Sequence, residues 1–185
     1  GAVVVEKEIP ALKYSFEIWS QMLAAAGGHT FRDLLGNYGE IHLGKELFRW
    51  LLRRGAHTLP ALALAWGESL TFIVPDNKDE MIALGAELRA ELMREIGAHG
   101  VMLFPPYSRT APAHYFPMLL PLHASHTAVF NALELPVTQV PLGLDERGLP
   151  LGVQVVSAPG QDHICVAVAL ELERALGGWV PPWAA

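Results

Sequence analysis

Serines, lysines and histidines are the side chains of this chain that could supply a nucleophile or a base. A serine nucleophile needs a base within hydrogen-bond reach and oxyanion donors, which are usually backbone N–H groups in a glycine-rich turn. No serine of the chain is flanked by glycine, and no lysine belongs to a Gly/Ser-rich stretch. The serines are Ser15, Ser20, Ser69, Ser108, Ser125 and Ser157. We therefore expect no catalytic residue for hydrolysis within this sequence.

Three histidines, His114, His123 and His126, suggest a metal hypothesis, because positions i and i+3 lie on one side of a helix. Against it, the only cysteine is remote and Glu134 is the one carboxylate nearby. A protein zinc site needs at least three ligands. The sequence therefore favours histidines that line a cleft or are hydrogen-bonded in the interior. We expect no metal and no cofactor.

Charge and hydropathy limit the class of protein. The net charge of −6 argues against a nucleic-acid surface, which requires clustered lysine and arginine. No stretch approaches the roughly 18–20 apolar residues of a membrane span, and residues 1–5 lack the charged start of a secretory signal. The single Cys165 can form no internal disulfide. It lies within the pattern of the closing helix, and we expect it to be buried where that helix packs.

The apolar content is high for a domain of this length. Hydrophobic residues make up 51% of the 185 residues, and the mean hydropathy is +0.28. Soluble domains are usually about 45–50% apolar. We interpret the chain as one incomplete domain whose apolar surface is partly covered by sequence outside it. The alternative is a complete and well-packed α/β domain.

The first half of the chain is dominated by helical spacing. Apolar residues recur at three- and four-residue steps in residues 14–26 and 41–52, and proline stands early in a further helix over 58–66. The longest helical pattern covers residues 76–96 and is richly charged, with Met81, Leu84, Leu88 and Leu92 on one face. We therefore predict a mainly helical segment over residues 1–99.

Residues 100–185 carry strand patterns and one closing helix. Residues 101–104 are predicted to form a buried strand, followed by a proline-rich loop to residue 117. Two further strands are predicted around residues 137–140 and 151–156, and a helix over 162–176. This part predicts an α/β fold in which helices cover a sheet.

Several positions in this second part have specific expected roles. Pro141 is expected to end the first of the paired strands, because proline cannot donate to the ladder. Residues 145–148 form a polar turn with a positive φ at Gly148. Gln154 is expected to bond backbone groups from within its strand. Asp162 is well placed to cap the closing helix, which Gly177 ends.

The order of these motifs resembles the C-terminal block of the amidase signature family. The block runs as an apolar strand, a proline-rich loop, a helix that ends near Phe130-Asn131, a strand, a turn, a Gly-Leu-Pro-x-Gly-x-Gln strand from Gly148, and a closing helix. Within the family the chain is most similar to the fatty-acid amide hydrolase 2 type. The residues that carry this similarity are 14–16, 31–36, 111–114, 135–139, 141–144 and 177–180.

The resemblance implies the C-terminal part of the amidase signature fold, a mixed sheet covered by helices. It implies hydrolysis of fatty-acid amides by a Ser–Ser–Lys triad, which belongs to a Gly/Ser-rich signature that this sequence lacks. The implied partners are the N-terminal amidase segment and, through the full-length enzyme, a fatty-acid amide. The implied location is intracellular, with membrane association only through upstream sequence.

By the same resemblance, the helix before Phe130-Asn131 lines the acyl channel. His123, Ala124, Thr127 and Ala128 are the expected channel residues, and their small neighbours leave room for a chain. The alternative is close helix packing by the same small residues. Family members often carry asparagine in place of His123 and glycine in place of Glu134. A second function class, a non-catalytic interaction or scaffold domain with the amidase fold, also stays open.

Overall fold

The computed structural model describes residues 2–37, 39–68, 77–118, 121–181 and 183. The chain divides into two compact units, Gly1–Leu23 with Asp79–Ala185, and Ala24–Lys78. The elements in chain order are η1 (Pro10–Tyr14), α1 (Ser15–Ala26), α2 (Phe31–Leu35), α3 (Leu43–Leu51), α4 (Leu59–Glu68), α5 (Lys78–Ile96), β1 (Met102–Phe104), η3 (Phe116–Met118), η4 (Pro121–Ala124), α6 (Ser125–Ala132), β2 (Val137–Leu144), β3 (Pro150–Val156) and α7 (Asp162–Leu176).

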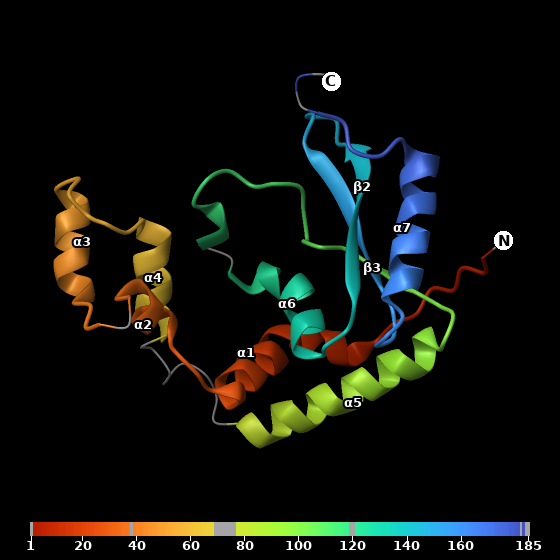
Figure 1. The fold of residues 1–185 in the computed structure, drawn as a ribbon, viewed down its shortest axis with the longest axis horizontal. Coiled ribbons are helices and arrows are strands. Elements are labelled where there is room, and N and C mark those ends of the chain that lie inside the picture. The colour runs from red at the N-terminus through yellow and green to blue at the C-terminus, as the bar shows by residue number, and fades with distance from the viewer. Residues whose placement is uncertain (1, 38, 69–76, 119–120, 182, 184–185) are drawn as a thin grey trace. The chain divides into compact units, whose positions relative to one another are not determined.

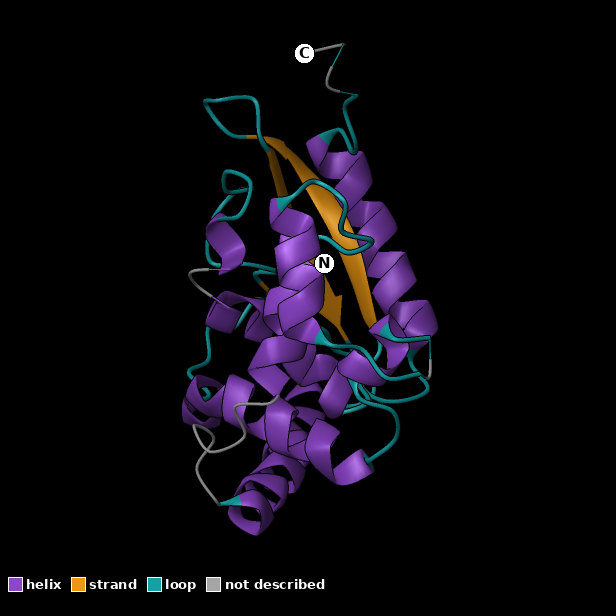
Figure 2. Ribbon diagram, turned by 90° about the vertical axis from the view of Figure 1, so that its left-hand side faces the viewer, coloured by secondary structure: helices purple, strands orange, loops and turns teal. Residues whose placement is uncertain are grey.

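The first unit contains a three-stranded antiparallel sheet in the strand order β1-β3-β2. Figure 1 shows its hairpin, β2 and β3, beside α7. The central strand β3 pairs with both neighbours, so that Val156 lies opposite Met102 on one side and Val137 on the other. The predicted α/β class is confirmed, with helices packed around these strands (Figure 2). Both pairs among the described strands are antiparallel. The parallel pairing that the expected mixed sheet requires is not seen among these described strands.

The prediction that Pro141 ends its strand is wrong. β2 continues through Pro141 to Leu144, and the pairing with β3 shifts register between Pro141 and Gly143. Gly143 has φ of 100°, a torsion that glycine adopts without strain. Proline is tolerated because β2 is at the edge of the described sheet, where one side of the strand needs no ladder partner.

The two faces of β3 are covered by different helices. Val155 packs with Cys165 and Ala169 of α7 in one apolar cluster. Val156, which points to the opposite face as alternation requires, packs with Phe130 of α6 in another. Figure 1 shows α6 and α7 on the two sides of the hairpin. The end of β3 is therefore covered on both faces, as its composition predicts.

The helices α1 and α5 complete this core. Ile18 of α1 is fully buried with Leu88 and Leu92 of α5, in the same cluster as Phe130. The two helices approach closely at Gly85, where an added Cβ would lie 2.9 Å from Met22 Sδ and 3.0 Å from Ile18 Cγ2. A side chain at this position would require Met22 and Ile18 to shift.

Two further details of the first unit correct the sequence-based expectation. β1 is not a buried strand, because it lies at the sheet edge and Leu103 is 51% exposed. Asp162 is the first residue of α7 and does not cap it, since Gln161 occupies the cap position. The expected end of α7 is confirmed, because Gly177 follows it with φ of 87°.

The second unit is a group of short helices with a small core. Ile41, Leu43, Leu62 and Ala65 are its buried apolar residues. A capping box begins α2: the Thr30 hydroxyl accepts from the Asp33 N–H at 3.1 Å, and the Thr30 N–H donates to the Asp33 carboxylate at 2.9 Å. The backbone N–H of Thr30, and after it the Thr30 hydroxyl, lower the pKa of the Asp33 carboxyl.

All described elements before residue 100 are helical, as the sequence predicts for residues 1–99. The division into domains at residues 99 and 100 stays a prediction. Among the described residues, no helix has both the length and the apolar character that crossing a bilayer requires.

Candidate functional site

A cleft of about 910 Å³ opens along the β2–β3 hairpin of the first unit. One wall is the proline-rich loop at residues 105–112, and the floor includes Pro141 and Gly152 of the two strands. Glu173 of α7 and the exposed Trp179 complete the lining. The cleft is therefore bounded by the long loop that the sequence predicts between β1 and the hairpin.

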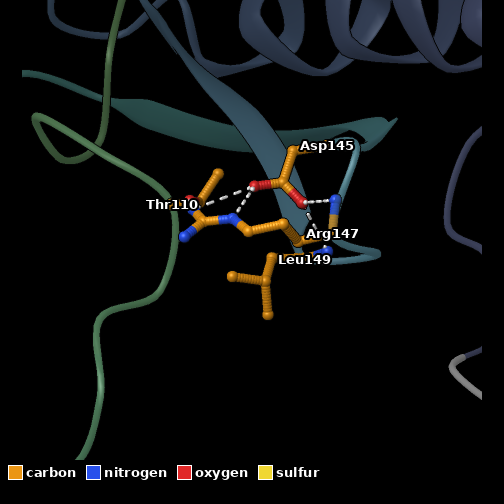
Figure 3. Close-up of polar contacts among 4 residues, drawn as sticks. All are labelled: Thr110, Asp145, Arg147 and Leu149. Carbon is orange, nitrogen blue, oxygen red and sulfur yellow. Dashed lines mark hydrogen bonds and ion pairs between the residues drawn. The ribbon is translucent and has the colours of Figure 1, made fainter.

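The tip of the hairpin holds this loop from one side (Figure 3). The Asp145 carboxylate accepts hydrogen bonds from the backbone N–H groups of Arg147 and Leu149, each at 2.9 Å. The Arg147 guanidinium binds the same carboxylate at 3.2 Å and donates to the Thr110 hydroxyl at 2.8 Å. The predicted positive φ of Gly148 is confirmed at 77°. The turn thus connects directly to the cleft wall.

The electrostatics of this turn favour a charged carboxylate. The backbone N–H of Leu149 is the largest cause that lowers the pKa of Asp145, with the Arg147 N–H and side chain acting in the same direction. Partial burial works against it and raises the pKa. The net direction is a lowered pKa, as expected for a carboxylate that accepts several hydrogen bonds.

Gln154 ties β3 to both the loop and α6. Its side-chain amide donates to the Pro105 carbonyl oxygen at 3.2 Å and to the His126 carbonyl oxygen at 3.0 Å. Only 3% of Gln154 is exposed. The expectation that Gln154 bonds backbone groups is therefore confirmed, and its two partners lie 49 and 28 residues away in the sequence.

Ser108 and His123 meet on the loop side of the site. The Ser108 hydroxyl is hydrogen-bonded to His123 Nδ1, and the Tyr107 ring lies against the imidazole with 5.4 Å between ring centroids. Sequence reasoning missed this pair. The two residues are separated by a loop without periodic pattern, so no local signal predicts that they meet.

The expected channel residues lie on η4 and α6. His123 and Ala128 are half-buried, whereas Ala124 and Thr127 are exposed. The Thr127 hydroxyl donates to the Ala124 carbonyl at 3.1 Å. None of the four is among the described residues that line the cleft. Their role in a channel stays a prediction.

The end of α6 shows the backbone conformation at Glu134, where family members often carry glycine. Glu134 has φ of 54°, in the left-handed region that favours glycine. Its N–H donates to the Asn131 carbonyl at 3.2 Å, and the next N–H, of Leu135, donates to Phe130 at 3.1 Å. This closure of a helix end usually requires glycine at its left-handed position. Here Arg89 lies 3.8 Å from the Glu134 carboxylate.

The remaining histidines do not gather around one point. His126 lies against the Phe104 ring with 5.5 Å between centroids, and its Nδ1 is buried without a partner. His114 is exposed on the loop. Within the described part of the chain, no group of three or more histidine, cysteine, aspartate or glutamate side chains could hold a metal ion.

Several described serines and lysines contact groups other than each other. Ser15 and Ser157 donate to nearby backbone carbonyls, at 2.5 Å from Leu12 for the first and 3.0 Å from Gln161 for the second. Lys7 forms an ion pair with Glu95 at 2.6 Å, which lowers the pKa of that carboxyl. Ser69 lies outside the described residues.

Comparison with known proteins gives consistent results. The family described as Amidase matches residues 1–166. Fatty-acid amide hydrolase 2 of Homo sapiens is 41% identical over 98% of this chain, and the chain spans 35% of that protein. Fatty-acid amide hydrolase 2-A of Danio rerio is 42% identical, with the same two shares. A glutamyl-tRNA(Gln) amidotransferase chain of Thermotoga maritima has a similar fold, with a TM-score of 0.56 at 19% identity over 97% of this chain and 37% of its own.

Proposed function

The chain belongs to the amidase family, a family of hydrolases, and from this premise we propose that it is the C-terminal part of a fatty-acid amide hydrolase. The complete enzyme converts a fatty-acid amide to the free fatty acid and an amine. The observation that carries the proposal is the 41–42% identity to fatty-acid amide hydrolase 2 over 98% of the chain. The chain contributes part of the sheet and one wall of the substrate channel.

In this proposal the hydrolytic groups come from sequence outside the chain, as its span of 35% of the relatives allows. The side-chain contacts support this. Lys7 is committed to Glu95, and the Lys13 ammonium lies 4.8 Å from the Tyr14 ring centroid. These two lysines therefore contact a carboxylate and an aromatic ring, whereas a lysine base would need a serine hydroxyl within hydrogen-bond reach.

The Ser108–His123 pair is a structural contact in this proposal, not a nucleophile and its base. A serine–histidine pair that performs acyl transfer needs a third group to orient the imidazole and N–H donors for the oxyanion. The neighbour that the structure gives His123 is the Tyr107 ring, which cannot replace a carboxylate. The hydrogen bond between Ser108 and His123 instead joins the cleft loop to η4.

The channel wall in this proposal is the outward side of η4 and α6. Ala124 and Thr127 are exposed, and Ala128 is half-buried beside the buried Val129 and Phe130. Small exposed side chains over a packed apolar layer leave room for an acyl chain to lie against the helix. The proposal therefore needs a second wall from the remainder of the enzyme.

Activity-based labelling tests whether the hydrolytic groups come from sequence outside this chain. The purified 185-residue chain should react with no serine-directed fluorophosphonate probe and should hydrolyse no long-chain fatty-acid amide. A longer protein that contains both this sequence and a Gly/Ser-rich amidase segment should do both. Stoichiometric labelling of a serine in the chain alone would overturn the proposal. Failure of the longer protein to hydrolyse any amide would favour a scaffold domain that keeps the fold.

The channel wall is tested by Ala128→Phe in that longer protein. The larger side chain should reduce turnover of long-chain amides by about ten-fold or more and leave short-chain turnover nearly unchanged, because only a long chain reaches this helix. Ala167→Phe, at an exposed position of α7, is the matched control. Equal loss for both substrates with a lower Tm would show that position 128 only packs.

Membrane association also has a candidate surface, in the second unit. Phe48 and Leu51 of α3 are 62% and 70% exposed, and Trp66 of α4 is 47% exposed. The exposed Arg53 and Arg54 follow α3 directly. Exposed apolar and aromatic groups beside cations suit the interface of an anionic bilayer. The expectation that upstream sequence provides attachment stays a separate prediction.

Vesicle flotation tests this surface. The chain should float with vesicles that contain an anionic phospholipid, and Leu51→Ser with Phe48→Ser should abolish that binding. Leu176→Ser, at a position that is 50% exposed in the first unit, is the control and should float like the unchanged chain. Binding that survives the double variant would place membrane contact elsewhere.

A further inference from the structure

Gln154 occupies an unusual place for a polar side chain. It lies in the central strand β3, is almost completely buried, and faces the same side of the sheet as Val156. That side is the one covered by α6, because Val156 packs with Phe130. A buried amide must bond fully or it destabilises the fold.

Its two hydrogen bonds reach two separate segments. A side-chain amide carries two N–H donors, and Nε2 of Gln154 donates to the carbonyls of both Pro105 and His126. Both neighbours are acceptors, so only the amide nitrogen can face them and the orientation of the group is fixed.

The two carbonyls belong to the parts that form the candidate site. Pro105 follows the last residue of β1, and Pro106 after it has no N–H, so the chain leaves the ladder at this point. Its carbonyl opens the loop that walls the cleft. His126 lies within α6, between the expected channel residues Ala124 and Ala128.

We infer that Gln154 is a positioning residue for the substrate site, which holds α6 and the start of the cleft loop in fixed register on β3. This inference rests on the proposed function for its effect on substrate. The Phe104–Phe130 edge-to-face contact, at 5.3 Å between centroids, also joins β1 to α6. Apolar contacts are less directional than hydrogen bonds, so they hold the helix near the sheet without fixing its register.

Gln154→Met tests the inference without a large change of volume. Methionine has a similar length and no donor, so the carbonyls of Pro105 and His126 lose this partner. Hydrogen exchange of the 185-residue chain should accelerate by about ten-fold or more at residues 102–104, which lead into Pro105, and at residues 125–132 together. The β2–β3 ladder should keep its protection. Leu170→Met, at a position of α7 that is 45% exposed and outside the cleft lining, is the control and should leave both segments unchanged.

Gln154→Glu separates bonding from packing, because glutamate has nearly the same shape. The charged form repels both carbonyls, whereas the protonated form can donate to one of them. Burial and the two facing carbonyls raise the pKa of this glutamate. Exchange in the two segments should therefore be fast where the glutamate is charged and slow again, relative to the unchanged chain, as pH falls through that raised pKa. If the two segments are equally protected in Gln154→Met, in Gln154→Glu and in the unchanged chain, Gln154 does not hold them in place and the inference is wrong.

The effect on substrate is measured in the longer enzyme. Gln154→Met should raise KM for a long-chain amide by about ten-fold and leave kcat for a short-chain amide unchanged. Loosened segments with an unchanged ratio of long- to short-chain KM would overturn the positioning role. If the unmodified enzyme hydrolyses no fatty-acid amide, the proposed function fails by itself, and the exchange experiment still decides whether Gln154 makes the tie.

Discussion

The two compact units hold their helices in different ways. In the first unit, contacts join segments that are distant in sequence: Gln154 reaches His126, and the Arg89 guanidinium donates to the Leu133 carbonyl at 2.8 Å from 44 residues away. In the second unit, neighbouring helices share four buried apolar residues, and capping of α2 stays within three residues. The first unit is therefore joined by side-chain hydrogen bonds between distant segments, whereas the second is held mainly by apolar packing among its short helices.

The same contrast appears in the exposed apolar groups. The first unit buries Phe130 and Leu133 completely between the sheet, α1 and α5. The second unit exposes large side chains such as Phe48 and Leu51. Burial contributes free energy in proportion to the apolar area removed from water. We infer that the first unit carries most of the folding stability and that the second is freer to present side chains to a partner.

The largest expected effect comes from emptying the centre of the first unit. Phe130→Ala removes a fully buried ring that contacts Phe104 edge to face, and should lower the free energy of unfolding by about 3–5 kcal/mol. Phe48→Ala, at an exposed site of the second unit, should change it by about 0.5 kcal/mol or less. Urea denaturation followed by circular dichroism measures both, and similar losses would erase the distinction between the units.

Hydrogen exchange compares the hairpin and α7 with the first helices, which include α1 of the first unit and the helices of the second. The backbone of residues 153–156 and 166–172 should exchange more slowly than that of residues 14–66, because it lies in the sheet and in the helix that covers it. Mass spectrometry of peptides from the labelled chain resolves the two regions. Greater protection in residues 14–66 would mean that the core lies in the first helices.

A smaller effect compares the backbone strain at Glu134 with the stabilisation from its ion pair with Arg89. Glu134→Gly relieves a left-handed torsion and loses a contact with Arg89 that is largely exposed. We expect a gain of about 0.5–1 kcal/mol in the free energy of unfolding, because glycine adopts this torsion freely and exposed ion pairs contribute little. Glu134→Ala keeps the strain and should not stabilise. A loss with glycine would show that the Arg89 contact outweighs the torsion.

Local patterns predicted much of this molecule. The apolar spacing of α3, α5 and α7 follows from a period of 3.6 residues, so each helix is visible within its own stretch of sequence. Gly148 and Gly177 are readable for a similar reason, since a positive φ is a property of one residue. The family was also readable, because its motifs are contiguous.

Two of the wrong predictions share one physical cause. Pro141 was expected to end a strand and Leu103 to be buried, and both depend on whether a strand lies at the edge or the centre of a sheet. The residue pattern of one strand does not show which strands lie beside it, because pairing joins segments far apart in the chain. The cap of α7 differs for a smaller reason: the helix already includes Asp162 as its first residue, so the cap position falls on Gln161.

The sequence by itself determined the helices, the turn at Gly148, the burial of Cys165 and membership of the amidase family, since each depends on residues that are adjacent or regularly spaced. It also indicated that Gln154 must bond backbone groups. Only the tertiary structure decided which groups these are, and that Ser108 meets His123 and Arg147 meets Thr110. Those contacts join loops without periodicity, and their geometry is fixed by the packing of β3 between α6 and α7.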